Sequence, residues 1–281
     1  MAQLPARVRL VIFDLDGVIY RGHEPIAGAR ELVAWLHSTR TLVRFATNNS
    51  TVARAGYVDR LAAHGIRASE DEIVTSTSAT IEHLRRHAPE VRRVLGIGAD
   101  GMRQELDAAG FDVVMSGDVA PTPSGAPISG FDAVLVGLDP ELGYARLAAG
   151  MAAVAGGARL IATNADARYP TADGFAPGAG AIVNALATAT GVEPDVIGKP
   201  SPAMFLAIME ASGVPPEASV VVGDNPSADV AGAHRAGCSA ILVLTGVADR
   251  AMAEGLEGER APDAIADDPA AVRELLADRL S

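Results

Sequence analysis

The chain has 281 residues, more than one domain usually contains, so one large α/β unit or two medium units are the starting options. Hydrophobic residues make up 49% and charged residues 21%, which is typical of a globular protein and excludes a disordered or fibrous chain. The 35 acidic and 23 basic residues give a net charge of -12, which disfavours nucleic acids and anionic membranes as partners.

Cysteine usage and hydropathy predict a cytoplasmic protein. The single cysteine, Cys238, cannot form an intramolecular disulfide. Asp14 and Asp16 interrupt the first apolar run, so no secretory signal is expected. No stretch approaches the roughly 18 uninterrupted apolar residues of a membrane span.

Short apolar strands alternate with helices from the N-terminus onward. The first strand, residues 8–13, ends in a DLDG turn and is followed by a helix at 26–38. A second strand at 42–46 ends in the sequence TNNS, and a helix at 52–64 stops at Gly65. This order predicts a parallel sheet.

Two further sets of elements follow. The first contains a helix near Thr80, strands at 91–97, 131–136 and 159–162, and two intervening helices, with a loop at 115–130. From about residue 195 the opening pattern resumes, with strands at 196–197, 219–222 and 241–244 and a closing strand and helix within 261–281. We therefore predict an α/β protein with a doubly wound, Rossmann-like parallel sheet, whose ligands gather at the carboxyl ends of the strands.

Paired carboxylates follow the first strand. Asp14 and Asp16 are two residues apart, which can hold both side chains at the sheet edge, and Gly17 allows a sharp turn after them. Two close carboxylates require a cation or a shared proton, and they suit a nucleophile with a general acid or base. By itself the motif is more often an acidic surface turn than a catalytic pair.

Three other polar turns follow predicted strands. The Thr47 hydroxyl and the backbone N–H groups after it can grip phosphate oxygens, although an ordinary helix cap has the same composition. Lys199, between Gly198 and Pro200, offers a compact ammonium that can balance a phosphoryl group.

Asp224 and Asp229 enclose the fourth turn. Their carboxylates provide the hard oxygen ligands that Mg²⁺ prefers. Asp229 could equally cap the next helix.

The motifs DLDG, TNNS, GKP and GDNPSAD, in this order, resemble those of the haloacid-dehalogenase-like phosphatases. An α/β insert between the second and third motifs, together with DGVIYRG and GKPSP, is similar to the class IIA, NagD-type branch. The resemblance implies a core domain formed by residues 1–79 and 191–281 and an inserted α/β cap domain at 80–190. It also implies a phosphatase that acts on a small phosphate ester.

The resemblance also implies roles for the motif residues. Asp14 would be the nucleophile, Asp16 the general acid and base, and Lys199 the neutralising cation. The substrate phosphate would be bound by Thr47, Asn48 and Asn49. Mg²⁺ would be held by Asp14, Asp224 and the backbone carbonyl of Asp16, with Asn225 and Asp229 in or beside its coordination shell.

The inserted segment contains a second candidate binding sequence. Asn164 and Asp166 end the strand at 159–162, and the following loop through Arg168, Tyr169, Pro170 and Gly174 is expected to face the core site and select the substrate. A plain surface turn is the alternative. The six histidines show no metal-ligand spacing and are assigned no role.

Three functional readings remain open at this point. The leading one is Mg²⁺-dependent hydrolysis of a small organic phosphate monoester, with glycerol 3-phosphate and 2-phosphoglycolate as first guesses, through an aspartyl-phosphate. The alternatives are a phosphotransferase that uses the same intermediate and a non-catalytic phosphate-ligand sensor. Asp16 argues against dehalogenase chemistry, because a halide leaving group needs no proton. Related branches form homodimers through their caps, but no stretch here marks an interface.

Overall fold

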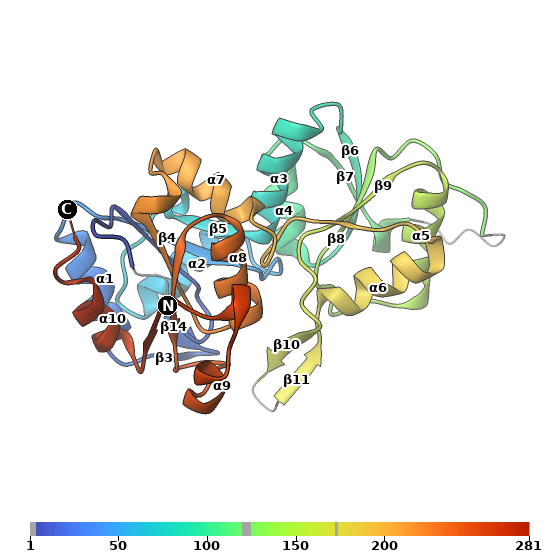
Figure 1. The fold of residues 1–281 in the computed structure, drawn as a ribbon. Coiled ribbons are helices and arrows are strands. Elements are labelled where there is room, and N and C mark those ends of the chain that lie inside the picture. The colour runs from blue at the N-terminus through green and yellow to red at the C-terminus, as the bar shows by residue number, and fades with distance from the viewer. Residues whose placement is uncertain (1–3, 120–124, 172–173, 281) are drawn as a thin grey trace. The chain divides into compact units, whose positions relative to one another are not determined.

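The structure is a computed structural model that describes residues 4–119, 125–171 and 174–280. The chain forms two compact units. The first unit comprises residues 1–47, 55–74 and 199–281, and the second comprises 48–54 and 75–198. Figure 1 shows the elements of both units.

The first unit is built on a six-stranded sheet in the order β15-β14-β13-β1-β4-β5. Pairing is parallel from β15 through to β4. The strands are β1 (Leu10–Phe13), β4 (Leu42–Thr47), β5 (Ile73–Thr75), β13 (Ser219–Gly223), β14 (Ser239–Val243) and β15 (Ala264–Ala266). All four residues of the central strand β1, LVIF, are buried, as expected for a strand covered on both faces.

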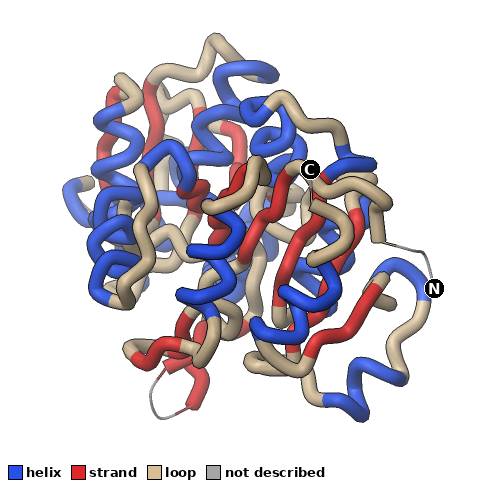
Figure 2. The backbone as a smooth tube through the Cα atoms, turned by 90° about the vertical axis from the view of Figure 1, so that its left-hand side faces the viewer, coloured by secondary structure: helices blue, strands red, loops and turns tan. Residues whose placement is uncertain are grey.

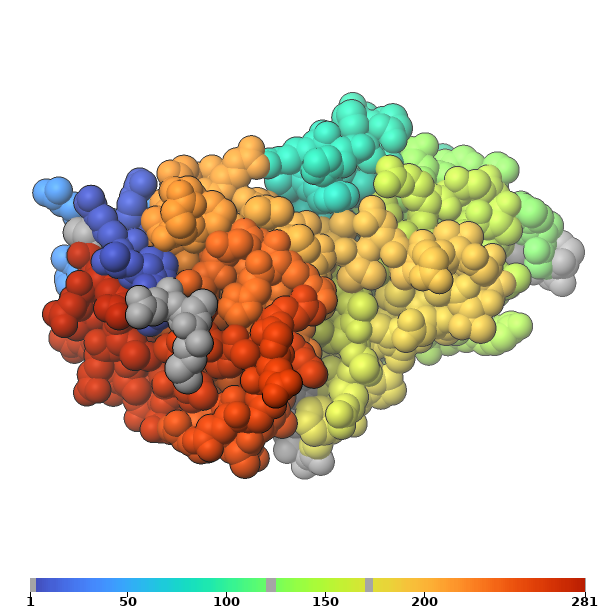
Figure 3. All heavy atoms as spheres, viewed as in Figure 1, coloured from blue at the N-terminus to red at the C-terminus, as the bar shows by residue number. Residues whose placement is uncertain are grey.

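Helices surround this sheet, as the tube in Figure 2 shows. They are α1 (Ala29–His37), α2 (Arg54–Ala63), α7 (Ala203–Ser212), α8 (Ala231–Arg235), α9 (Arg250–Glu254) and α10 (Pro269–Leu276). Helices α1 and α10 pack against each other. In Figure 3 dark blue atoms from the start of the described chain lie near red atoms from its end, in agreement with the backbone bridge between Val8 and Leu280. A short hairpin, β2 (Tyr20–Arg21) with β3 (Glu24–Pro25), follows β1.

The second unit has its own five-stranded sheet in the order β12-β9-β8-β6-β7, paired in parallel throughout. Its strands are β6 (Arg93–Ile97), β7 (Asp112–Met115), β8 (Ala133–Val136), β9 (Arg159–Ala162) and β12 (Asp195–Val196). Its helices are α3 (Ser76–His87), α4 (Asp100–Ala108), α5 (Tyr144–Ala155) and α6 (Ala179–Thr190). A buried cluster that includes Leu95, Val134, Leu160 and Val183 forms its core. The predicted α/β class with parallel sheets is confirmed.

Several elements differ from the sequence prediction. The strand at 196–197 was expected to begin the return to the first sheet, but β12 pairs with β9 of the second unit, with Asp195 opposite Ile161. Strand β7 was not predicted. The loop expected after Asp166 is instead an antiparallel hairpin, β10 (Arg168–Thr171) with β11 (Gly174–Pro177), in which the proline and glycine residues hide the strand pattern.

The segment at 48–54 belongs to the second unit, whereas the sequence assigned it to the core domain. Backbone contacts explain why: Gly101 donates its N–H to the Thr51 carbonyl at 3.2 Å, and the Arg54 N–H donates to the Glu105 carboxylate at 2.9 Å. A side chain at Gly101 would lie 2.5 Å from the backbone of Val52, so this close approach requires glycine. Among the described residues, no helix is long and apolar enough to cross a membrane.

Candidate active site

Three carboxylates gather at the carboxyl end of the first sheet. Asp14 follows β1, and its backbone N–H donates to the Val222 carbonyl of β13 at 2.9 Å. Asp224 and Asp229 lie in the segment after β13. One oxygen from each carboxylate lies within 4.8 Å of the others, and no second cluster of this kind occurs in the described parts of the chain. Parallel pairing of β1 with β13 is what brings the three together.

Lys199 lies among these carboxylates. Its ammonium donates to Asp14 Oδ1 at 2.5 Å and to Asp229 Oδ1 at 2.7 Å, and to the Ala46 carbonyl at 3.2 Å. The side chain is 3% exposed. Burial alone would lower the pKa of Lys199, but Asp14 and Asp229 outweigh it and raise the pKa. Lys199 is therefore a charged ammonium at neutral pH.

The charges of this cluster favour a divalent cation. Three carboxylates around one ammonium leave two negative charges unbalanced. Burial raises the pKa of Asp14 well above its usual range; the Lys199 ammonium opposes this rise, and the carboxylates Asp229 and Asp224 add to it. Burial and Asp229 likewise raise the pKa of Asp224 to about 7. Such shifts are what crowded buried carboxylates undergo without a cation, and a bound metal ion would reverse them. The donor set fits a hard divalent ion.

Glycines make room for the two carboxylates that follow β13. A Cβ atom on Gly246 would lie 1.8 Å from Asp224 Oδ2, and one on Gly17 would lie 2.3 Å from the same oxygen. Gly17 also has a φ of 81°, which glycine adopts without strain. A Cβ on Gly223 would lie 2.2 Å from Asp229 Cβ. Of these glycines, only Gly17 was singled out from the sequence.

The segment after Asp224 has a fixed local structure. Residues Pro226–Val230 form a π-helical turn that leads into α8, a distortion common at functional sites. The Asn225 side-chain oxygen accepts the N–H groups of Ser227 and Ala228 at 3.0 and 3.2 Å. The Asn225 N–H donates to Asp229 Oδ2 at 3.1 Å. Asn225, expected in or beside the metal shell, thus shapes the turn and orients Asp229.

Asp16 and Thr47 also lie in the first unit. Asp16 is half-buried, and burial raises its pKa, with the Arg60 guanidinium opposing that rise. Thr47 ends β4 and is 3% exposed, one residue after the carbonyl that Lys199 contacts. Arg60 lies on α2 and was not predicted, because no motif marks it.

The other residues expected to bind substrate lie in the second unit, since the limit between the units falls between Thr47 and Asn48. The Asn48 side-chain amide donates to Asp166 Oδ2 at 3.0 Å. The Asn164 amide donates to the Asn48 carbonyl at 2.7 Å, and the Asp166 N–H donates to Asn164 Oδ1 at 3.1 Å. Asn49 Oδ1 accepts the N–H and hydroxyl of Thr51, which fixes the turn. The structure thus joins Asn48, Asn164 and Asp166 in one network.

The chain is similar to known proteins along most of its length. Residues 11–112 match the profile of the haloacid dehalogenase-like hydrolases, and residues 196–272 match a HAD-hydrolase-like profile. The chain is 34% identical to the 5'-nucleotidase YutF of Bacillus subtilis, over 85% of this chain and 88% of that protein.

The chain belongs to the haloacid dehalogenase-like hydrolase family. It is also similar to solved phosphatases of this family. The p-nitrophenyl phosphatase of Archaeoglobus fulgidus is 32% identical, with a TM-score of 0.84 over 95% of this chain and 99% of that one. The glycerol phosphate phosphatase of Mycobacterium tuberculosis, in complex with magnesium, is 30% identical, with a TM-score of 0.83 over 96% and 78% of the two chains. The resemblance inferred from the motifs is confirmed, and the chain is a phosphoric monoester hydrolase of this family.

Proposed function

We propose that this protein is a Mg²⁺-dependent phosphatase that hydrolyses small organic phosphate monoesters through an aspartyl-phosphate at Asp14. The observation that supports it best is the contact of the Lys199 ammonium with both Asp14 and Asp229 inside a cluster of three carboxylates. A buried ammonium fixed beside the attacking oxygen can offset charge on a phosphoryl group without reorganising. Asp14 and Asp224 would provide carboxylates for the metal and Asp16 its backbone carbonyl, with Asp229 in or beside the coordination shell.

The first chemical step uses Asp14 and Asp16. An Asp14 carboxylate oxygen attacks phosphorus, the ester P–O bond breaks, and Asp16 gives a proton to the departing alcohol oxygen. The burial that raises the pKa of Asp16 favours the protonated acid needed here. Mg²⁺, when bound, would neutralise phosphoryl charge beside the carboxylates.

The second step returns the enzyme to its starting state. Asp16, now a carboxylate, removes a proton from water as the water oxygen attacks phosphorus. The bond between Asp14 and phosphorus breaks, inorganic phosphate leaves, and Asp16 is again protonated. Lys199 holds Asp14 in place through both steps, while Thr47, Asn48 and Asn49 contribute hydroxyl and amide groups for the phosphate oxygens.

We propose glycerol 3-phosphate or 2-phosphoglycolate as the substrate. A similar protein, from Mycobacterium tuberculosis, is named a D-glycerol 3-phosphate phosphatase and is 34% identical over 84% of this chain. Other relatives carry the names 5'-nucleotidase and acid sugar phosphatase, so the compounds compared should all be small phosphate esters. The buried lone thiol of Cys238 supports our further proposal of a cytoplasmic location.

The test is a phosphate-release assay on a panel of these esters, with Mg²⁺, with Ca²⁺ and with a chelator. We expect release with Mg²⁺, its loss on chelation, and the highest kcat/KM for a three- or two-carbon ester. With 4-nitrophenyl phosphate as the donor, adding a large excess of glycerol as acceptor distinguishes hydrolysis from transfer: phosphorylated glycerol in place of inorganic phosphate would indicate a phosphotransferase. No turnover of any ester by folded, Mg²⁺-loaded protein would contradict the proposal.

A further inference from the structure

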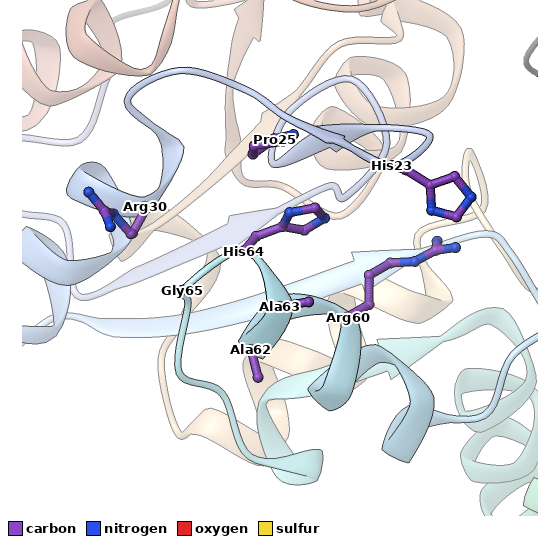
Figure 4. Close-up of a pocket in the computed structure, with 8 residues that line it drawn as sticks. All are labelled: His23, Pro25, Arg30, Arg60, Ala62, Ala63, His64 and Gly65. Atoms are coloured by element: carbon purple, nitrogen blue, oxygen red, sulfur yellow. The ribbon is translucent and has the colours of Figure 1, made fainter.

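A surface pocket of about 840 Å³ lies in the first unit, beside the β2–β3 hairpin and the end of α2, and none of the motif carboxylates lines it. Figure 4 shows its lining. Four of the eight lining side chains are basic, namely His23, Arg30, Arg60 and His64, and none is a carboxylate. In a chain with a net charge of -12, a pocket lined in this way provides local positive charge.

Tyr20 holds two of the basic groups in place. Its ring is completely buried. The Arg60 guanidinium carbon lies 5.1 Å from the centre of this ring, and the His64 ring centre lies 5.5 Å from it. Packing of two donors against one immobile ring orients them before any ligand arrives.

The hairpin fixes His23. Tyr20 pairs with Pro25 and Arg21 pairs with Glu24, so Gly22 and His23 form a two-residue turn. Gly22 has a φ of 60°, which suits a glycine at the first position of such a turn. The Arg21 guanidinium donates to the Thr245 carbonyl at 2.5 Å and ties the hairpin to the rest of the unit. In Figure 4, His23, His64 and Arg60 extend toward the same side, and Arg30 lies at the other end.

The two arginines differ in their partners. Arg30 donates to the Glu31 carboxylate from two nitrogens, at 3.0 and 2.6 Å, so its charge is already compensated. Arg60 has no carboxylate oxygen within ion-pair distance in the part of the chain that the structure describes, although the charge of Asp16 acts on its guanidinium from farther away. With five N–H groups and no close carboxylate, Arg60 retains donor capacity for an anion from outside.

We propose that this pocket is an accessory binding site for a small dianion that carries a phosphate group. The planar guanidinium of Arg60 matches two phosphate oxygens, and the imidazoles of His23 and His64 supply further N–H donors. A basic pocket on an acidic protein favours a small ligand over a nucleic acid, whose backbone the remaining surface would repel. The ligand is either inorganic phosphate or a phosphate monoester. The site is separate from the carboxylate cluster around Lys199 and stands whether or not that cluster performs the proposed chemistry.

The test observes the imidazole nitrogens directly by NMR. Full-length protein carrying Asp14→Asn, which removes turnover, is titrated at fixed pH and ionic strength with inorganic phosphate in one series and with glycerol 3-phosphate in another. We expect the ring signals of His23 and His64 to shift together along one saturable curve. The signal of His234, whose ring nitrogens already contact the Glu259 carbonyl and the Asp263 carboxylate, should stay in place and serves as the internal control.

Two substitutions of equal charge change make the test decisive. Arg60→Gln should raise the dissociation constant at least about tenfold, because charged hydrogen bonds to phosphate are lost. Arg30→Gln should change it less than about twofold, since Glu31 already compensates that charge. If Arg60→Gln folds poorly, Arg60→Lys should still fold and bind with intermediate affinity. The series in which the ring signals reach a plateau shows whether the site binds inorganic phosphate or a phosphate monoester. Linear, non-saturating shifts with both ligands, or equal effects of the two Gln variants, would overturn the proposal.

Discussion

Asn48 and Asp166 are 118 residues apart in sequence and joined by a 3.0 Å hydrogen bond, in which the amide donates to the carboxylate. Asp166 therefore orients a residue of the TNNS motif, a different role from direct selection of the substrate by its charge. If orientation is its role, Asp166→Asn should keep most activity, because an amide oxygen still accepts from Asn48. Asp166→Ala should lose about tenfold or more in kcat/KM, the cost of one unmade hydrogen bond. Steady-state kinetics on 4-nitrophenyl phosphate compares the two, and an equal loss would show that the charge itself is needed.

Lys199 should control stability as well as activity. Lys199→Met leaves three buried carboxylates without their ammonium, and breaking a buried ion pair costs about 3–5 kcal/mol. We expect a lower Tm without metal and a larger rise in Tm on adding Mg²⁺ than in the wild type, because a cation then replaces the missing charge. Thermal unfolding with and without Mg²⁺ measures both effects. A variant with unchanged Tm and unchanged metal response would show that the cluster is not electrostatically strained.

The space beside Asp224 can be removed by a single methyl group. In Gly246→Ala the new Cβ would overlap Asp224 Oδ2, so the carboxylate must move. We expect the Mg²⁺ concentration for half-maximal activity to rise at least about tenfold, a typical cost of displacing a group at a metal site. Gly255→Ala is the matched control, because its nearest contacts are ordinary at 3.6 Å. If both variants need the same Mg²⁺ concentration, Asp224 does not hold the metal.

Cys238 should be inert toward thiol reagents in the folded protein. It is buried, and burial raises the pKa of its thiol to about 12. Since the thiolate is the reactive form, labelling at pH 8 should be slow and should accelerate on unfolding in urea. Labelling followed by mass spectrometry, with and without urea, measures the ratio. Rapid stoichiometric labelling of native protein would mean that this segment opens readily.

Much of the first unit follows from its sequence, because each buried strand ends in a polar motif that marks the sheet edge. Asp14, Lys199, Asp224 and Asp229 could all be predicted to meet there. Gly223 and Gly246 are needed because the side chains of Asp229 and Asp224 lie close to their backbones, and the spacing of residues in the sequence does not reveal such contacts. Strand β12 has only two residues, too few to carry a hydrophobic pattern, so its pairing with β9 could not be predicted from the sequence. The turn between Tyr20 and Pro25 and the position of Arg60 likewise carry no motif.

The most direct test of an aspartyl-phosphate at Asp14 is a rapid-mixing experiment with the Asp16→Asn variant, Mg²⁺ and 4-nitrophenyl phosphate. The nitrophenolate leaves without a proton from Asp16, but removal of the phosphoryl group still needs that carboxylate as a base. We expect a burst of one nitrophenolate per enzyme molecule and, after acid quench, a gain of one phosphoryl group on the peptide that contains Asp14. The Asp14→Asn variant should show neither. A phosphoryl group on another residue, or full steady-state turnover by Asp14→Asn, would contradict the mechanism.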